Sequence, residues 1–370
     1  MSDFPRTVDE ITPEWLTQVL RESGAIREAT VVQGDASNIG VDQGVVAQVH
    51  RLELTYDSAL EDAPGHVIAK LALQVNLDSP ELGDAVWTLY DREVRFFLDL
   101  APESGMQTPA VYYANFDPTT GHFIILLEDL SHLRAVDQAD ESSPKDSSAA
   151  MRALASMHSK WWNNDELHGF QWLADHPWAA PANVVSQMFP NNVEPFLKIA
   201  DGHVPDGIEA LCNKLIPKIS EVWAELSSPP ISLNHGDFRL TNMFFDDSGG
   251  DIPRVIAYDW QTAGRIRPAD DVATFMLYGF TPRTRKAVEK SLLTEYHDSL
   301  REQGVRDYSY EQFIDDFRLA LLPKMVGRVI STVTASSGLR STPEGSARFY
   351  ATIERLQALI DWNCDEVIPK

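Results

Sequence analysis

Short hydrophobic runs of strand length occur through the first third of the chain, and at residues 45–56 they alternate with polar positions, as in a strand with one buried face. Five such runs come before residue 128, namely residues 31–34, 45–56, 66–73, 110–115 and 123–127. The last two are joined through Pro118 and Gly121, which is typical of a hairpin turn. The pattern therefore predicts an antiparallel sheet of five strands.

Helical spacing occurs before and between these runs and dominates the rest of the chain. Thr12 and Pro13 begin a first helical segment, which Gly24 ends. A second segment covers residues 91–100, with apolar positions at Val94, Phe97, Leu98 and Leu100. After a polar linker at residues 137–148, further helices are predicted from residue 149 onward and at residues 204–226, 282–303, 310–333 and 343–361. Sheet first and helices afterwards indicates an α+β fold.

The composition narrows the class of protein. A chain of 370 residues with 44% hydrophobic content can bury a large core, and its length favours two lobes. Its 55 acidic and 31 basic residues give a formal charge of -24, which argues against a nucleic-acid partner. The two cysteines form no disulfide framework, and we see neither a signal-peptide layout nor an apolar run that could span a bilayer. We expect a cytoplasmic protein with no membrane partner.

Candidate chemistry surrounds a predicted hairpin at residues 243–258. Two apolar runs flank an acidic, glycine-containing turn, so antiparallel folding would bring Asn242 near Asp259. Amide and carboxylate oxygens of this kind suit Mg²⁺, which takes the rest of its shell from water and substrate phosphates. Asp237 lies just before them and could accept a proton from a hydroxyl. Protein kinases space a catalytic Asp, a metal-binding Asn and a metal-binding Asp in the same way. The alternative is an ordinary polar turn whose acids face solvent.

A lysine on the third predicted strand is the second candidate. Lys70, in V-I-A-K, is the only charge in an apolar run, and a buried amine needs an anionic partner. In kinases that partner is a nucleotide phosphate together with a Glu on the next helix, for which Glu93 is the best candidate. The alternative is that Lys70 reaches solvent at a sheet edge and Glu93 is a surface charge.

Two loops of the same region are weaker candidates. Gly34, Gly40 and Gly44 surround the loop between the first two strands but do not match G-x-G-x-x-G, so this loop either covers phosphates or is a plain hairpin loop. After the fifth strand, the backbone of Glu128 to Leu130 would face an adenine edge, although a chain also simply turns after a strand. Further on, we expect His158 to be a hydrogen-bonded core residue rather than a catalyst.

Six segments together resemble the aminoglycoside phosphotransferase and choline kinase superfamily, and within it the ecdysteroid-kinase-like and related bacterial small-molecule kinases. They are V-I-A-K, R-E-V-R-F-F, L-L-E-D-L, H-G-D-F-R-L-T-N, D-W-Q and D-D-V-A, and the resemblance covers residues 31–275. It implies a bilobal, protein-kinase-like α+β fold. Residues 1–130 would form an N-terminal lobe with the five-stranded sheet and a helix, and residues 131–370 a larger, mainly helical lobe.

The resemblance also implies roles for single residues. Asp237 would be the catalytic base, Asn242 and Asp259 the Mg²⁺ ligands, and Lys70 the phosphate-binding lysine paired with Glu93. His235 would be structural, and Asp271 would stabilise the catalytic loop from behind. Arg239 lies where related loops often carry a Lys beside the transferring phosphate, so it either steadies the γ-phosphate or forms a surface ion pair.

Departures from protein kinases bear on the acceptor. Trp260 and Gln261 follow the metal-binding Asp, and only a short loop separates them from Asp271, so no platform for a protein chain remains. We therefore expect transfer of the γ-phosphoryl group of ATP, with Mg²⁺, to the hydroxyl of a small molecule.

Three further hypotheses stay open. The chain could be a protein kinase, a catalytically silent nucleotide-binding regulator, or a kinase for hydroxyacyl thioesters, for which Arg265 and Arg267 are the nearest basic residues. Helices after Phe275 should line the acceptor pocket. They carry acids that suit a cationic sugar and aromatic residues that suit a sterol-like alcohol: Glu289, Glu295, Asp298, Tyr278, Phe280 and Tyr296.

Overall fold

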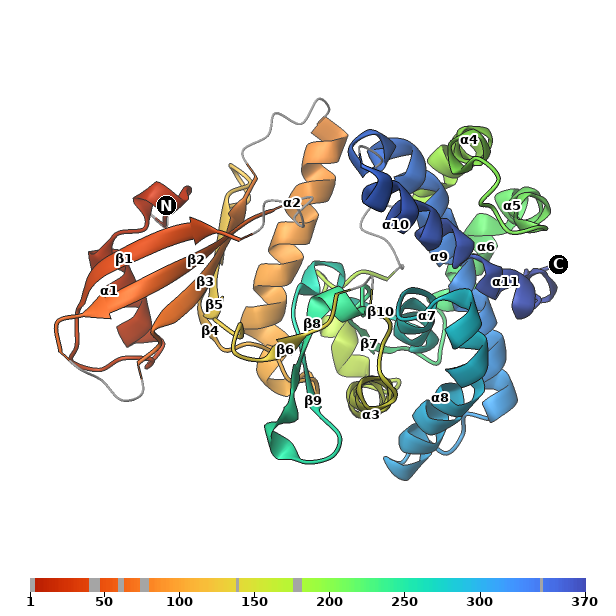
Figure 1. Cartoon of the computed structure of the whole chain (residues 1–370). Coiled ribbons are helices and arrows are strands. Elements are labelled where there is room, and N and C mark those ends of the chain that lie inside the picture. The colour runs from red at the N-terminus through yellow and green to blue at the C-terminus, as the bar shows by residue number, and fades with distance from the viewer. Residues whose placement is uncertain are drawn as a thin grey trace. The chain divides into compact units, whose positions relative to one another are not determined.

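The computed structural model describes residues 4–39, 47–58, 63–73, 80–137, 140–175, 182–339 and 342–370. The chain divides into two compact units (Figure 1). The first consists of Met1–Glu103 with Gln107–Leu133, and the second of Ser104–Met106 with Arg134–Lys370. The five-stranded sheet is antiparallel and lies in the first unit, while most helices lie in the second, so the fold is α+β, as predicted.

The first unit contains the predicted five-stranded sheet. Its strands lie in the order β1 (Val31–Asn38), β2 (Ala47–Tyr56), β3 (His66–Ala72), β5 (Phe123–Glu128) and β4 (Val111–Phe116). Every neighbouring pair is antiparallel. The predicted loop between the first two strands lies partly outside the described residues, and the part outside includes Gly40 and Gly44.

Helices cover both faces of this sheet because alternate side chains of a strand point to opposite faces. Helix α1 (Pro13–Glu22) begins after Thr12, whose side chain caps it, and buries Leu16 and Leu20 against Val67 and Leu126. The opposite face, which carries Phe123, packs against α2 (Pro80–Arg95), where Tyr90 stacks on the Phe123 ring at 4.1 Å.

One apolar position of the predicted second helix is wrong. Leu98 is 57% exposed, whereas Phe96, Phe97 and Leu100 are buried. The reason is that α2 continues into a π-helix at Phe96–Leu100, which changes the angle between successive side chains. The apolar stripe of an ideal α-helix therefore does not apply there.

The second unit contains two small sheets. β6 (Arg134–Ala135), β8 (Met243–Asp246) and β9 (Arg254–Ala257) form one, and β7 (Ser232–Asn234) pairs with β10 (Gly264–Ile266) in the other. The predicted hairpin is confirmed, and its register places Met243 opposite Ala257.

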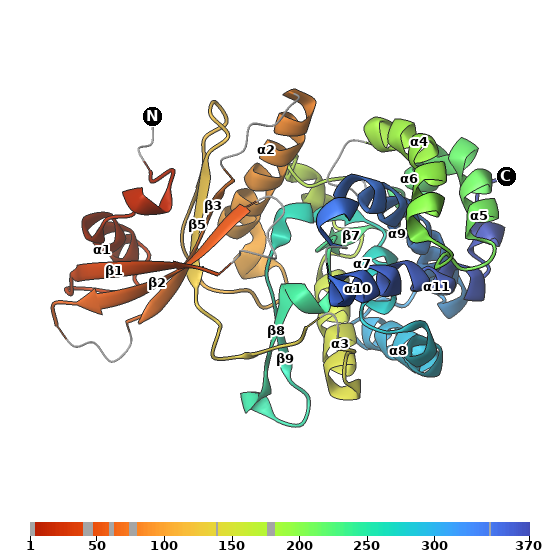
Figure 2. The same cartoon turned by 45° about the horizontal axis from the view of Figure 1, so that its top comes forward.

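Helices make up most of the second unit (Figure 2). They are α3 (Pro144–Lys160), α4 (Ala182–Ala200), α5 (Ile208–Leu215), α6 (Ile219–Leu226), α7 (Ala269–Tyr278), α8 (Pro282–Glu302), α9 (Tyr310–Leu339), α10 (Pro343–Glu354) and α11 (Gln357–Asp361). Helix α9 packs against α4, α7 and α10, and α3 lies beside α8. No helix in the described ranges is both long enough and apolar enough to cross a membrane.

Several helix predictions need correction, among them the single helix predicted at residues 343–361, which is divided into α10 and α11. The polar linker is shorter than predicted, because Ser143 caps α3 and Pro144 begins it. The single helix predicted at residues 204–226 is divided into α5 and α6 by a 3₁₀ turn at Ile216–Lys218, where Pro217 has no N–H to continue the helix. Helix α4 was not predicted, since Pro190 and Pro195 lie inside it.

Candidate active site

The loop between β7 and β8 carries most of the predicted catalytic residues. It leaves β7 at His235 and ends in a 3₁₀ turn at Leu240–Asn242. Gly236 has φ +85, and a Cβ at this position would lie 2.2 Å from the carbonyl oxygen of Thr262. The bend that presents Asp237 therefore requires glycine.

Asp271, near the start of α7, holds this loop from behind. Its carboxylate accepts hydrogen bonds from the backbone N–H of His235 at 2.7 Å and of Gly236 at 2.8 Å, and it is fully buried. Burial raises the pKa of Asp271, but hydrogen bonding and charge from His158 and His235 outweigh it, so the pKa is lowered overall. The contact predicted behind the catalytic loop is present.

The two histidines are structural, as predicted. His158 is fully buried, with Nδ1 2.8 Å from the Tyr296 hydroxyl and Nε2 3.4 Å from the Asp271 carboxylate. His235 places Nε2 2.9 Å from the carbonyl oxygen of Tyr258 and packs against Trp260, with ring centroids 4.4 Å apart. Both rings connect the loop to the surrounding core.

Asn242 joins the predicted base to the predicted metal site. Its Nδ2 donates to the Asp237 carboxylate and to the Asp237 carbonyl, both at 2.9 Å. The amide protons are thus directed toward Asp237, which leaves Oδ1 as the atom that could bind a cation. The Asn242 carbonyl in turn accepts a hydrogen bond from the Tyr258 N–H at 3.0 Å.

Asp259 comes directly after that contact. It follows Tyr258 with a left-handed backbone, φ +66 and ψ +60, which turns the chain where β9 ends. Gln261 Nε2 lies 3.4 Å from its carboxylate. The hairpin therefore brings the Asp259 segment next to Asn242, as the antiparallel prediction required. Within the described segments, no three His, Cys, Asp or Glu side chains form a metal-binding group.

Arg239 pairs with the predicted base itself. Its Nε lies 3.0 Å from the Asp237 carboxylate, with side chains 35% and 26% exposed, although the angle is not that of a hydrogen bond. Burial lowers the pKa of Arg239, while the charges of Asp237, Tyr278 and Asp259 raise it, and the raising effects prevail. The guanidinium therefore lies in the combined field of both predicted site carboxylates.

In the first unit, Lys70 and Glu93 form the expected ion pair. Nζ lies 2.7 Å from one carboxylate oxygen of Glu93 and 2.9 Å from the other. The side chain of Glu93 is 2% exposed and that of Lys70 12%, so neither is a surface charge. The sheet side chains on either side of Lys70 are apolar and buried, which leaves the carboxylate as the partner that the amine needs.

The backbone predicted to face an adenine edge is partly engaged within the sheet. The Glu128 N–H donates to the Ala110 carbonyl at 2.9 Å, so that group is not available to a base. The Leu130 carbonyl accepts from the Leu133 N–H at 2.9 Å, while the Leu130 N–H donates to no other described residue. The candidate donor in this segment is therefore Leu130.

Several residues predicted for the acceptor have structural contacts instead. Arg267 is buried between Asp316 and Glu225, and Glu289 pairs with Arg285. Tyr296 binds His158, and Phe280 is 2% exposed. Arg265 donates to the Leu167 carbonyl at 3.3 Å. These side chains stabilise the helical unit, so they give no support to either a cationic sugar or a thioester.

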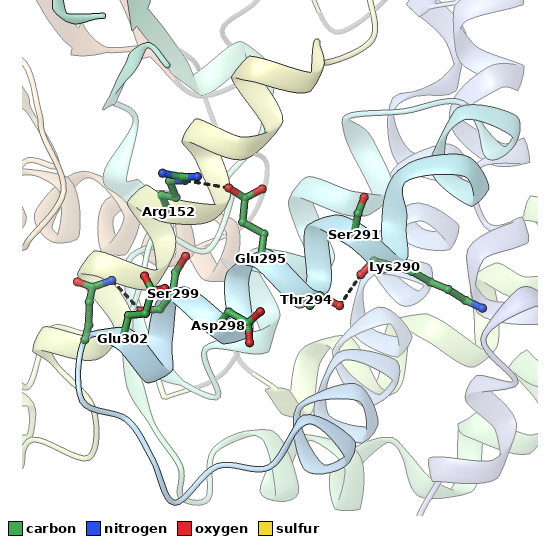
Figure 3. A pocket seen from close by; sticks show the side chains of 9 residues that line it. Arg152, Lys290, Ser291, Thr294, Glu295, Asp298, Ser299 and Glu302 are labelled. Atoms are coloured by element: carbon green, nitrogen blue, oxygen red, sulfur yellow. Dashed lines mark hydrogen bonds and ion pairs between the residues drawn. The ribbon is translucent and has the colours of Figure 1, made fainter. Parts of the chain in front are cut away.

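A pocket lies along α3 and α8, and its lining includes Glu295 and Asp298, two of the acids expected at the acceptor (Figure 3). Arg152 and Glu295 form an ion pair across it at 2.8 Å. Its lining is Arg152, Lys290, Ser291, Thr294, Glu295, Asp298, Ser299, Glu302 and Gln303. None of the predicted catalytic, nucleotide-binding or metal-binding residues belongs to this lining.

One buried ion pair near the site was not predicted. Lys324 of α9 places Nζ 2.6 Å from the carboxylate of Asp270, which is fully buried next to Asp271. The available signal was a lone lysine in the apolar stretch L-A-L-L-P-K-M-V, which is the same signal that identified Lys70. Lys324 belongs to no known motif, so this signal alone does not distinguish it from a surface lysine.

Comparison with known proteins supports the family resemblance described above. The sequence model of the ecdysteroid kinase-like family matches residues 44–308. No similar sequence was found among curated proteins.

Three solved structures share the fold. The choline kinase of Cryptosporidium parvum has a TM-score of 0.56 at 10% identity, over 95% of this chain and 98% of that one. Amicoumacin kinase, in complex with AMP-PNP, Ca²⁺ and Ami, has 0.53 at 12% identity, over 95% and 96%. The ethanolamine kinase of Plasmodium vivax has 0.52 at 11% identity, over 95% and 89%. At such identities the likeness shows the fold alone.

Proposed function

Because this chain belongs to the ecdysteroid kinase-like family, we propose that it transfers the γ-phosphoryl group of ATP to a hydroxyl group of a small molecule. The observation that carries the proposal is the Asn242 amide, which donates to Asp237 and leaves its oxygen toward a cation. A hydrogen-bonded acid beside a metal ligand is what phosphoryl transfer to an alcohol needs.

Asp237 is the proposed base. It orients the acceptor hydroxyl and takes its proton as the new P–O bond forms and the bond from the γ-phosphorus to the β-phosphate oxygen breaks. Asn242 fixes the carboxylate rotamer through its 2.9 Å hydrogen bond. We propose that Arg239, in ion-pair contact with the same carboxylate, interacts with the transferring group.

The residues present fit a Mg²⁺ ion. Asn242 Oδ1 and the Asp259 carboxylate are hard oxygen donors on adjoining segments, and Mg²⁺ usually takes one or two protein oxygens together with waters and substrate phosphates. Mg²⁺ bound there would neutralise charge on the phosphates of ATP. Lys70, held by Glu93, is the proposed ligand of the α- and β-phosphates, and the Leu130 N–H a proposed donor to adenine.

A small acceptor fits the chain better than a protein acceptor. After Asp259 the chain passes through the 3₁₀ turn Trp260–Thr262 and strand β10, and already enters α7 at Ala269. No long segment for holding a peptide intervenes. A catalytically silent regulator is less well supported, because it would have no need of the ordered Asp237–Asn242 pair.

The first test is removal of the base. With an acceptor identified by ATP consumption across amino sugars, macrolides, sterols, choline-like amines and hydroxyacyl thioesters, Asp237→Ala should lower transfer on the order of a hundredfold or more. AMP-PNP affinity should stay close to that of the wild type, since the base contacts the acceptor. Asp251→Ala, an exposed acid in the turn of the same hairpin, is the matched control. An equal loss of nucleotide affinity would contradict the role of Asp237 as base.

The second test concerns the metal. Asp259→Ala should weaken AMP-PNP binding in the presence of Mg²⁺ and leave the weaker binding without metal unchanged, because the carboxylate acts through the ion. Calorimetric titration with and without Mg²⁺ measures both quantities. If Asp259→Ala changes the two affinities equally, the carboxylate has no metal-binding role.

A further inference from the structure

Two arginines from different elements contact Tyr278 at the C-terminal end of α7, and a third lies within electrostatic range of it. Arg355, which follows α10, donates from Nη1 to the Tyr278 carbonyl at 2.6 Å. Arg328 of α9 lies over the Tyr278 ring, with Cζ 5.5 Å from the ring centroid. Arg239 of the catalytic loop is close enough for Tyr278 to affect its pKa. Arg239 also forms an ion pair with Asp237, the proposed base, and so connects these arginines to the proposed active site.

Among the described residues, two of the three arginines lie near an acid, and the third does not. Arg239 pairs with Asp237. Arg355 faces Glu141, whose carboxylate also accepts a hydrogen bond from the Thr281 N–H at 2.6 Å. Arg328 makes no ion pair with an acid of the described chain, and its buried Nε has no hydrogen-bond partner there. Arg328 is therefore the cation of this cluster that lacks a counter-charge.

Arg328 and Arg355 also repel each other. Burial lowers the pKa of Arg355 and the charge of Arg328 lowers it further, against smaller raising effects from Tyr278 and Glu141. Two like charges in a partly desolvated place raise the free energy of the folded protein unless an anion lies between or beside them. A chain with a net charge of -24 offers many acids that could have filled this place, yet none of the described ones does so for Arg328.

Guanidinium groups select the kind of anion. Their donors form a planar fork that matches the two oxygens of a carboxylate or phosphate, and an aromatic face keeps such a fork oriented. Arg328 is held in this way by the Tyr278 ring, and Arg355 by the Tyr278 carbonyl. The cluster is thus built to receive an anionic group rather than an ammonium group.

We propose that the acceptor carries a phosphate or carboxylate group besides its reactive hydroxyl, and that Arg328 and Arg355 bind this group beside Tyr278. The inference rests on the proposed function, since it describes the acceptor of that same site. It disfavours cationic amino sugars and choline-like amines, which the charge of Arg328, uncompensated within the described residues, would repel.

Two alternative roles for the arginines predict different titration results. In one, the arginines only stabilise the helices, as Arg355 does by binding a carbonyl at the C-terminus of α7. In the other, they bind the phosphates of the nucleotide. Small anions are therefore titrated into protein whose nucleotide site is already filled. If the arginines only stabilise helices or bind the nucleotide, no anion should bind to them under these conditions.

The experiment uses the full chain with saturating AMP-PNP and Mg²⁺, into which inorganic phosphate and, separately, acetate are titrated by calorimetry. The wild type should bind at least one of them saturably, and the better probe indicates whether the group is a phosphate or a carboxylate. Arg328→Gln should weaken that binding on the order of tenfold or more, because it removes a charge-assisted bidentate contact. Arg328→Lys keeps the charge without the fork and should fall between the two. Arg301→Gln, an exposed arginine on α8, is the matched control and should bind as the wild type does.

Three results would overturn the proposal: no saturable binding of either anion to the wild type, equal binding by Arg328→Gln and the wild type, or a loss of AMP-PNP affinity in Arg328→Gln in place of a loss of anion affinity. Circular dichroism checks that each variant is folded, and Arg328→Lys serves if Arg328→Gln is not. If AMP-PNP fails to bind the wild type, the proposed function fails instead, and the same anion titrations without nucleotide still decide whether Arg328 forms an anion site.

Discussion

The backbone conformation at Gly236 limits which residue this position of the proposed catalytic loop can hold. A side chain there would need the left-handed conformation that costs most residues about 1–2 kcal/mol. It would also place a Cβ 2.2 Å from the Thr262 carbonyl oxygen, a contact that only movement of the backbone can relieve. Any such movement would shift Asp237 and the N–H groups that bind Asp271.

We therefore predict that Gly236→Ala lowers the free energy of unfolding by at least about 2 kcal/mol and also lowers phosphoryl transfer. Urea unfolding and ATP consumption measure the two effects. Gly249→Ala, in the turn of the neighbouring hairpin, is the control, because its Cβ would meet only the Arg254 side chain at an ordinary 3.6 Å. Equal behaviour of the two variants would show that the loop tolerates a side chain at position 236.

Sequence reasoning identified single residues where two independent signals coincided. Lys70 combined a lone charge in an apolar strand with a known motif, and its partner Glu93 followed from the next helix. Arg328 and Lys324 show the first signal alone, as isolated cations in the apolar middle of α9. What they contact depends on α7, whose position relative to α9 no local pattern specifies. Tyr296 was assigned to the acceptor for the same reason, since its partner His158 comes from a distant segment.

The β8–β9 hairpin is the element that holds Asn242 and Asp259 together, and its turn depends on carboxylates. Asp246 accepts a hydrogen bond from the Ser248 N–H at 2.9 Å and pairs with Arg254. Asp247 binds Arg134 at 2.9 Å, which ties the turn to β6. Hydrogen bonds from Ser248, with a smaller contribution from Arg254, lower the pKa of Asp246 to about 2.

This lowered pKa makes the stability of the folded protein depend on pH in the acid range. A carboxyl whose pKa is lower in the folded state stabilises the protein above its unfolded value, here 3.8, and loses that contribution as the pH falls toward 2. We predict that Asp246→Asn lowers the thermal midpoint at pH 7 by on the order of a few degrees and reduces the decline of the midpoint between pH 4 and pH 2. Asp251→Ala, in the same turn, should follow the wild-type profile. Identical acid profiles for Asp246→Asn and the wild type would remove Asp246 from this role.

Helices and strands could be predicted where a local pattern of hydrophobic residues and end signals marked them. The five strands and α1 follow from alternation and from a Thr12–Pro13 start, and the structure confirms them. Helix α4 was missed because it contains Pro190 and Pro195, and proline normally breaks a helix. The break between α5 and α6 shows the opposite case, because the apolar spacing of one helix continues across Pro217 although the proline ends α5.

At the scale of the whole molecule, charge is buried in the core of the second unit, where α9 packs against α7. Asp270 is fully buried and its partner Lys324 is 7% exposed. Burial raises the pKa of Asp270 to about 6, against the lowering effect of Lys324, and the charges of Asp271 and Asp237 raise it further. The helical unit therefore carries its ion pair directly behind the proposed catalytic loop.

The sign of the resulting pH dependence can be worked out. An acid whose pKa is higher in the folded than in the unfolded protein contributes stability that is fully present below the unfolded value of 3.8 and is lost as the pH rises through about 6. Lys324→Met removes the cation that holds this pKa down, so the carboxyl resists ionisation to a still higher pH. At pH 8 the carboxyl of Asp270 must then either hold a proton against the pH of the solvent or stay charged without a partner, and either state costs about 3–5 kcal/mol of unfolding free energy.

We predict that Lys324→Met destabilises the protein by about this amount at pH 8 and by clearly less at pH 5, where Asp270 can take a proton without leaving a buried charge. Denaturant unfolding at both pH values measures the difference. The double variant Asp270→Asn, Lys324→Met is the control, because with no carboxyl at position 270 the pH dependence of the loss should largely disappear. An equal loss for Lys324→Met at pH 5 and pH 8 would mean that Lys324 stabilises α9 through packing of its stem, and that the charge on Asp270 is compensated by other groups.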